Sequence, residues 1–171
     1  MPGAATRPLR VGLYGFFGMG NLGNEGSLAA FLAHLRAEHP DVQVSCFGAD
    51  GAEIEREVVR AMVFLRARSL AMGFSGARPV VAETLLALLN AGVTPVVREH
   101  GSLGASGDLA PLASAALVLL GEGEARLADG TLTDGATAIA AAGVAPLALR
   151  AKEGLALING TDGMLGMLVL A

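Results

Sequence analysis

The chain's interpretation depends on residues 101–112, which read Gly101-Ser102-Leu103-Gly104-Ala105-Ser106-Gly107-Asp108-Leu109-Ala110-Pro111-Leu112. In a tightly bent backbone, the amide nitrogen of Gly107 can attack the carbonyl carbon of Ala105 and close a five-membered ring. Loss of water from the ring and from the Ser106 side chain leaves a methylidene-imidazolone, which is an electron-poor alkene. Glycine suits the attacking position because it has no Cβ to block the approach.

The neighbouring residues fit the same chemistry. Gly101 and Gly104 give the backbone freedom to bend, while Asp108 could assist proton transfer and cap the following helix. An ordinary loop is the alternative, because Ala-Ser-Gly is a common tripeptide in a chain this rich in alanine and glycine.

The whole of residues 101–112 resembles the cofactor-forming segment of the histidine and phenylalanine ammonia-lyases. The resemblance continues upstream through residues 76–79 and 89–97, and downstream through residues 120–123 and 152–163. It occurs in order and at natural spacing, so we identify residues 53–171 as similar to an internal piece of an aromatic amino acid lyase. Residues 161–167 look most like bacterial histidine ammonia-lyases.

This resemblance implies a reaction and a prosthetic group. Ala105, Ser106 and Gly107 would form 4-methylidene-imidazol-5-one (MIO), and L-histidine would lose ammonia without oxidation to give urocanate. Asn159 matches the family's asparagine beside the ring, whose carbonyl its amide can hydrogen-bond. The alternative for Asn159 is an Asn-Gly turn that caps the final helix. No metal is implied.

Other parts of the family's active site have no counterpart in the matched residues. Its tyrosine base and substrate-contacting histidine lie upstream of the equivalent of Glu53, and further contacts lie beyond the equivalent of Ala171. The only tyrosine is Tyr14, in the leading segment, and it is no candidate for the base. The full-length family forms homotetramers with shared sites. We interpret the apolar end as a truncation, and we expect impaired activity and association through uncovered helix faces.

The expected fold is mainly α: a helical lyase-like fragment (residues 52–171) after a small βαβ unit (residues 1–51). Pro79 and Gly92 are expected to bound one helix. Residues 93–107 are expected to be a loop, 109–120 a helix buried nearly all round, 125–133 a hairpin and 136–142 a short helix. An earlier helix is expected to end at Gly73 and to place one set of residues near one face: Ile54, Val58, Met62, Leu65 and Ser69. Another set, Glu55, Arg56, Arg60 and Arg66, is expected elsewhere on it.

The leading segment has a different pattern. Residues 9–14 and 42–47 alternate like strands around a helix that begins near Ser27, which predicts two parallel strands. Gly18, Gly20 and Gly23 have the spacing of a phosphate-binding loop, with Asp50 as a possible ribose ligand. Residues 14–26 instead resemble the start of polysaccharide pyruvyl transferases, although those enzymes usually carry Asp where this chain has Asn24.

Composition excludes several other classes. The formal charge of −4 and the lack of a dense basic cluster argue against nucleic-acid binding. No apolar run approaches the roughly 20 residues that cross a bilayer, and no signal peptide is recognisable, so we expect a cytoplasmic protein without membrane contact. Cys46 is the only cysteine, so no intrachain disulfide can form.

The three histidines do not clearly indicate a metal site or an active site. His34 and His39 are interpreted as surface residues, because no acidic or thiol partner falls at metal-ligand spacing. His100 precedes the Ala-Ser-Gly segment and could line a site there, or simply be solvated. Arg98 and Glu99 are expected to form a surface ion pair.

Three hypotheses remain open. The chain is an ammonia-lyase fragment that forms MIO, a pyruvyl-transferase-like module that binds nucleotide-sugars, or a non-functional fusion. Release of ammonia from an aromatic amino acid would favour the first, and binding of a nucleotide-sugar or phosphoenolpyruvate would favour the second.

Overall fold

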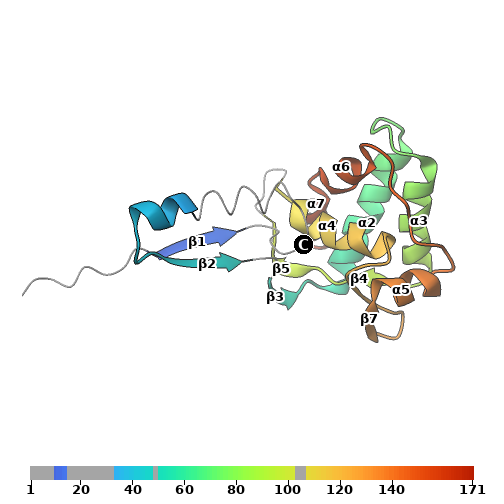
Figure 1. Cartoon of the computed structure of the whole chain (residues 1–171). Coiled ribbons are helices and arrows are strands. Elements are labelled where there is room, and N and C mark those ends of the chain that lie inside the picture. The colour runs from blue at the N-terminus through green and yellow to red at the C-terminus, as the bar shows by residue number, and fades with distance from the viewer. Residues whose placement is uncertain (1–9, 15–32, 48–49, 103–106) are drawn as a thin grey trace, which may run out of the picture. The chain divides into compact units, whose positions relative to one another are not determined.

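The computed structural model describes residues 10–14, 33–47, 50–102 and 107–171. The chain divides into two compact units, residues 1–49 (unit 1) and residues 50–171 (unit 2) (Figure 1). The candidate site residues of the lyase-like segment all belong to unit 2.

Unit 1 contains a parallel pair of strands. β1 (Arg10–Tyr14) pairs with β2 (Gln43–Phe47) in a register that sets Arg10 beside Gln43 and Tyr14 beside Phe47. Residues 33–38 are helical and lie between the two strands in the sequence. Because parallel neighbours need a crossover connection, this confirms the predicted βαβ pattern.

Helices make up most of unit 2, which confirms the mainly α prediction. They are α2 (Arg56–Ala71), α3 (Pro79–Asn90), α4 (Leu109–Leu119), α5 (Gly135–Ala141), α6 (Glu153–Ile158) and α7 (Asp162–Leu170). Pro79 is the first residue of α3, where the amide hydrogen it lacks would have had no helical partner. Gly73 and Gly92 follow α2 and α3 with φ of +79° and +71°, a conformation that ends a helix at little cost for glycine.

Short strands connect these helices. β4 (Thr94–Pro95), β6 (Glu124–Arg126) and β7 (Leu132–Asp134) form an antiparallel sheet, and β3 (Asp50–Glu53) pairs with β5 (Arg98–His100). The β6–β7 hairpin was predicted and is confirmed. The loop predicted for residues 93–107 is wrong at β4 and β5, because strands of two or three residues show no periodicity of their own.

The core lies among α2, α3, α4, α5 and the β4–β6–β7 sheet. Val81, Leu88, Val118, Leu119 and Ile139 are completely buried. The prediction that α4 is buried nearly all round is confirmed, except that its first residue is 44% exposed. Burial on nearly every side explains why α4 carries no charged residue.

The inner face of α2 differs from the prediction. Its buried residues are Val59, Met62, Val63, Arg66, Ala67 and Leu70. Ile54, from which the predicted face was counted, lies before the helix, and its N–H donates to the carbonyl of Val97. The predicted face is right at Met62 but is shifted overall, because Val58, Leu65 and Ser69 are only partly buried. The prediction also wrongly placed Arg66 on the outer side.

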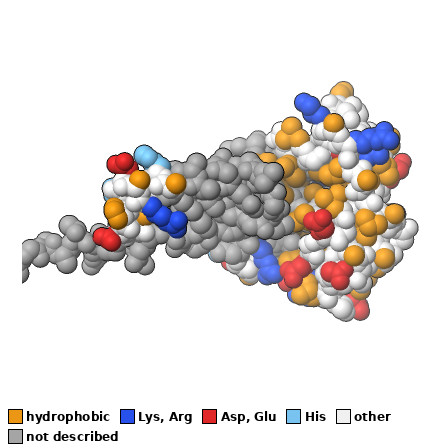
Figure 2. All heavy atoms as spheres, in the orientation of Figure 1, with side chains coloured by type: hydrophobic (Ala, Val, Ile, Leu, Met, Phe, Trp, Pro, Cys, Tyr) orange, Lys and Arg blue, Asp and Glu red, His pale blue; other side chains and the backbone are white. Residues whose placement is uncertain are grey.

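Helices α2 and α7 run antiparallel and touch closely. A Cβ on Gly166 would lie 2.8 Å from the carbonyl oxygen of Val58 and 3.1 Å from the nitrogen of Met62, so glycine permits this approach. On the other side of α7, Leu168 and Val169 are 71% and 66% exposed. Figure 2 shows hydrophobic side chains spread over one face of unit 2. None of the helices within the described ranges is long and apolar enough to cross a membrane.

Candidate functional site

The structure describes both ends of the Ala-Ser-Gly segment. β5 leads into Gly101 and Ser102, and residues 107–108 lead into α4. The predicted ring residues Ala105 and Ser106 lie outside the described residues. Gly107, which would supply the attacking nitrogen, is half-buried directly before Asp108. The contacts that hold Asp108 in place therefore also restrain one end of the Ala-Ser-Gly segment.

Asp108 is completely buried and fully engaged in hydrogen bonds. One carboxylate oxygen accepts a hydrogen bond from Ser102 Oγ, and the other accepts from the backbone N–H of Met164 at 2.9 Å. Asp108 occupies the N-cap position of α4, but its side chain accepts no bond from the first turn of that helix. The predicted capping role is wrong, because one carboxylate oxygen binds Ser102, before the Ala-Ser-Gly segment, and the other binds Met164, near the start of α7.

Asn159 lies at the end of α6, where its N–H donates to the carbonyl of Leu155 at 3.0 Å. It is exposed, and Gly160 follows it. Thr161 holds the N-cap position of α7. The alternative in which Asn159 caps the final helix is therefore wrong, because Thr161 holds that position and Asn159 ends α6 instead.

A buried ion pair holds the turn that follows Asn159. Arg66 and Asp162 are 6% and 4% exposed, and Arg66 Nη2 donates to a carboxylate oxygen of Asp162. Arg66 Nη1 donates to the carbonyl of Ala156 at 3.2 Å. A Cβ on Gly160 would collide with the guanidinium, which explains the glycine after Asn159. Sequence reasoning missed this pair, although the spacing of Arg66 from Met62 and from Leu70 could have revealed it.

A second ion pair fixes the start of α6. The carboxylate of Glu153, which is 2% exposed, receives two bonds of 2.7 Å from the Arg78 guanidinium and one of 2.7 Å from the backbone N–H of Arg150. Hydrogen bonding by Arg78, and then by Arg150, lowers the pKa of Glu153 from 4.5 to about 2. The helix that carries Asn159 is thereby anchored to the N-terminus of α3.

Replacing Glu153 with glutamine is expected to lower the free energy of unfolding at neutral pH and to make it depend less on pH in the acid range. Because the folded-state pKa lies below the ordinary value, the carboxylate's contribution is complete above that value and disappears as the pH falls toward about 2. Urea unfolding at about pH 7 and about pH 3 would measure the difference. Glu53→Gln is the matched control, since Glu53 pairs with Arg126 at 2.7 Å but is 29% exposed. An unchanged acid dependence in Glu153→Gln would contradict the expectation.

The charged residues of β5 pair differently from the prediction. Arg98 lies 3.3 Å from Glu124 on β6, and the predicted pair with Glu99 is wrong because neighbouring strand residues point to opposite faces. Glu99 instead lies 3.6 Å from the ring of His100, whose side chain is 62% exposed. The structure therefore places His100 on the surface of unit 2.

The remaining candidates give no second site. His34 and His39 are exposed, as predicted, and no group of three or more potential metal ligands occurs among the described residues. Gly18, Gly20 and Gly23 lie outside the described ranges. Asp50 begins β3.

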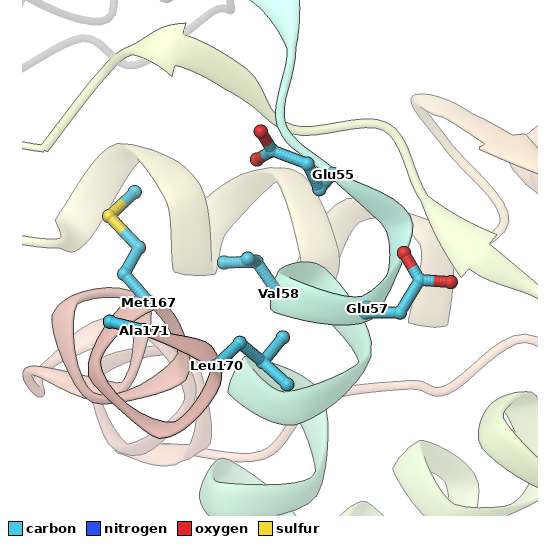
Figure 3. A pocket seen from close by; sticks show the side chains of 6 residues that line it. All are labelled: Glu55, Glu57, Val58, Met167, Leu170 and Ala171. Atoms are coloured by element: carbon cyan, nitrogen blue, oxygen red, sulfur yellow. The ribbon is translucent and has the colours of Figure 1, made fainter.

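A shallow pocket of about 450 Å³ lies between the N-terminal end of α2 and the C-terminal end of α7 (Figure 3). None of the candidate site residues lines it. The lining residues are Glu55, Glu57, Val58, Met167, Leu170 and Ala171. Arg66 lies about two helical turns further along α2 than Val58. The pocket belongs to the α2–α7 contact and not to the candidate site.

Comparison with known proteins identifies similar molecules. The chain matches the family model of aromatic amino acid lyases over residues 18–171. Histidine ammonia-lyase of Streptomyces griseus is 62% identical over 121 residues, which cover 71% of this chain and 24% of that protein. The chain thus spans about a quarter of the length of the curated relatives it matches.

Solved structures show the same relationship. A phenylalanine aminomutase from Pantoea agglomerans superposes with a TM-score of 0.66 and 43% identity, covering 70% of this chain and 23% of that one. Histidine ammonia-lyase from Trypanosoma cruzi superposes with a TM-score of 0.63 and 39% identity, over 68% and 23% of the two chains. The resemblance of residues 14–26 to pyruvyl transferases stays a prediction, and the family match overlaps that segment from residue 18 onward.

Proposed function

The chain belongs to the aromatic amino acid lyase family, and from this premise we propose that it serves the non-oxidative deamination of L-histidine to urocanate and ammonia. The observation that carries the proposal is the 62% identity to a histidine ammonia-lyase over 121 residues. In a chain of 171 residues, a match of that length necessarily includes residues 101–112. The family match also includes Asn159.

We assign the formation of MIO to Ala105, Ser106 and Gly107. The nitrogen of Gly107 bonds to the carbonyl carbon of Ala105, and two waters leave, one of them with the Ser106 hydroxyl. The described flanks support this assignment, because Ser102, before the segment, donates a hydrogen bond to Asp108, after it. Such a link brings the two ends together and favours a tight bend. We also assign the acceptance of the Gly107 amide proton to the buried carboxylate of Asp108, the next residue in the sequence.

Once formed, the ring would supply an electrophile that makes the amino group of the substrate a better leaving group. Asn159 is proposed to donate a hydrogen bond from its side-chain amide to the ring carbonyl. Its exposed side chain and its position after α6 support this role. The proposed partners are an amino acid substrate and, as the family resemblance implies, further copies in a homotetramer. The proposed location is the cytoplasm.

The intact mass of the purified chain tests the proposal, with Ser106→Ala as the control. The unmodified protein is expected to be lighter than its sequence mass by two waters, and the variant is expected to show its full mass. Without the Ser106 hydroxyl there is no leaving group for the second water. A full mass in both proteins would refute MIO formation in this chain. A deficit in the unmodified protein alone would lead to assays of histidine and of phenylalanine for release of ammonia.

A further inference from the structure

We propose that Arg66 is a positioning residue that fixes Asn159 relative to Gly107 and Asp108, the described end of the ring-forming segment, acting through its ion pair with Asp162. This inference rests on the proposed function, because it concerns the placement of two groups assigned to the same site. Arg66 lies within α2, far in the sequence from both groups. Its guanidinium nevertheless reaches the turn that follows Asn159.

Two contacts define this turn. Arg66 binds both the carbonyl of Ala156 on α6 and the carboxylate of Asp162 at the start of α7, so it spans the turn from one helix to the other. Gly160 lies against the same guanidinium, since a Cβ there would collide with it. The direction in which the backbone leaves α6, and therefore the place of Asn159, depends on Arg66.

A second connection links this turn to the reacting segment. The N–H of Met164, two residues after Asp162, donates to Asp108 at 2.9 Å. A Cβ on Gly163 would lie 3.1 Å from the Asp108 carboxylate, so this backbone packs directly on Asp108. Arg66 thus lies against Gly160, the residue after Asn159, while Asp108 directly follows Gly107. The start of α7 joins the two.

Energetics favour a positioning role over a purely stabilising one. Taking two charges out of water is costly, and apolar replacements of a buried ion pair are often neutral or stabilising. Arg66 Nε is buried and has no hydrogen-bond partner among the described residues, which adds to the cost. What an apolar pair could not provide is the directional contact with Ala156, Gly160 and Asp162.

The test replaces both partners, as Arg66→Met with Asp162→Leu, in the 171-residue chain. The matched control is Arg126→Met with Glu53→Leu, another paired guanidinium and carboxylate that is distant from Asn159 in the sequence. Three measurements are made on each protein: the melting profile, the intact mass, and amide hydrogen exchange of residues 159–164. We expect the Arg66–Asp162 double variant to melt cooperatively, to retain both waters, and to exchange about tenfold faster at residues 159–164. The control should match the unmodified chain in mass and in exchange of those residues.

A double variant that loses both waters, or that exchanges as slowly as the unmodified chain at residues 159–164, would overturn the inference. If the unmodified chain itself keeps both waters, the proposed function fails, and the exchange measurement alone decides whether Arg66 positions the turn. If the double variant does not fold, Arg66→Lys takes its place. Lysine keeps the charge but lacks the fork that reaches two acceptors, so exchange and water loss should be intermediate. Equality with the unmodified chain in both would again overturn the inference.

Discussion

Replacing Asp162 alone with alanine is expected to destabilise unit 2 by about 3–5 kcal/mol, because the Arg66 guanidinium is left buried without its carboxylate. Both side chains are less than a tenth exposed, so little water can replace the lost partner. The loss should appear as a lower midpoint of urea unfolding, followed by circular dichroism at neutral pH.

Asp134→Ala provides the comparison for this effect. Asp134 also stands at the start of a helix, where its side chain accepts a hydrogen bond from the N–H of Thr137, but it is exposed. Asp134→Ala should lower the free energy of unfolding much less than Asp162→Ala does, because water can solvate the freed N–H of Thr137. Equal destabilisation by the two substitutions would mean that burial of the Arg66–Asp162 pair is not what makes Asp162 important. The double variant of Arg66 and Asp162 should be more stable than Asp162→Ala, since it leaves no unpaired buried charge.

Local signals account for the parts of the fold that the sequence predicted. Pro79 and Gly92 bound α3 because each residue has a backbone preference that acts on its own position. The turn at Asp129 and Gly130 fixes the β6–β7 hairpin in the same way, with Asp129 accepting a hydrogen bond from the N–H of Thr131. These elements need no knowledge of what lies across the core.

Features that depend on distant partners were not predictable. The phase of α2 is set by packing against α3 and α7, and a pattern counted from Ile54 placed Arg66 outside. Asp108 looked like a helix cap because of its place in the sequence, whereas its hydrogen bonds go to Ser102 and to Met164, 56 residues further along. The candidate site residues themselves came from a resemblance over many segments. No periodicity pointed to Asn159.

The second large effect is expected at Asp108. Replacement by alanine removes the acceptor for Ser102 and for the N–H of Met164 and leaves a cavity in a completely buried place. Hydrogen bonds to a charged group contribute about 1.5–3 kcal/mol each, so we expect a loss of about 3 kcal/mol or more in the free energy of unfolding. Urea unfolding measures this, and intact mass should show that the variant keeps both waters.

Asp108→Asn separates the structural role from the chemical one. Asparagine has nearly the same shape, its oxygen can accept from Met164, and its amide can donate to Ser102 Oγ, so stability should stay within about 1 kcal/mol of the unmodified chain. The neutral amide cannot take a proton from Gly107, so water loss should be much slower despite an intact fold. Full loss of two waters in Asp108→Asn would show that Asp108 acts only by holding the segment and α7 together. Retention of both waters in a stable Asp108→Asn chain would instead locate proton transfer at this carboxylate, because the contacts that hold the segment would still be present.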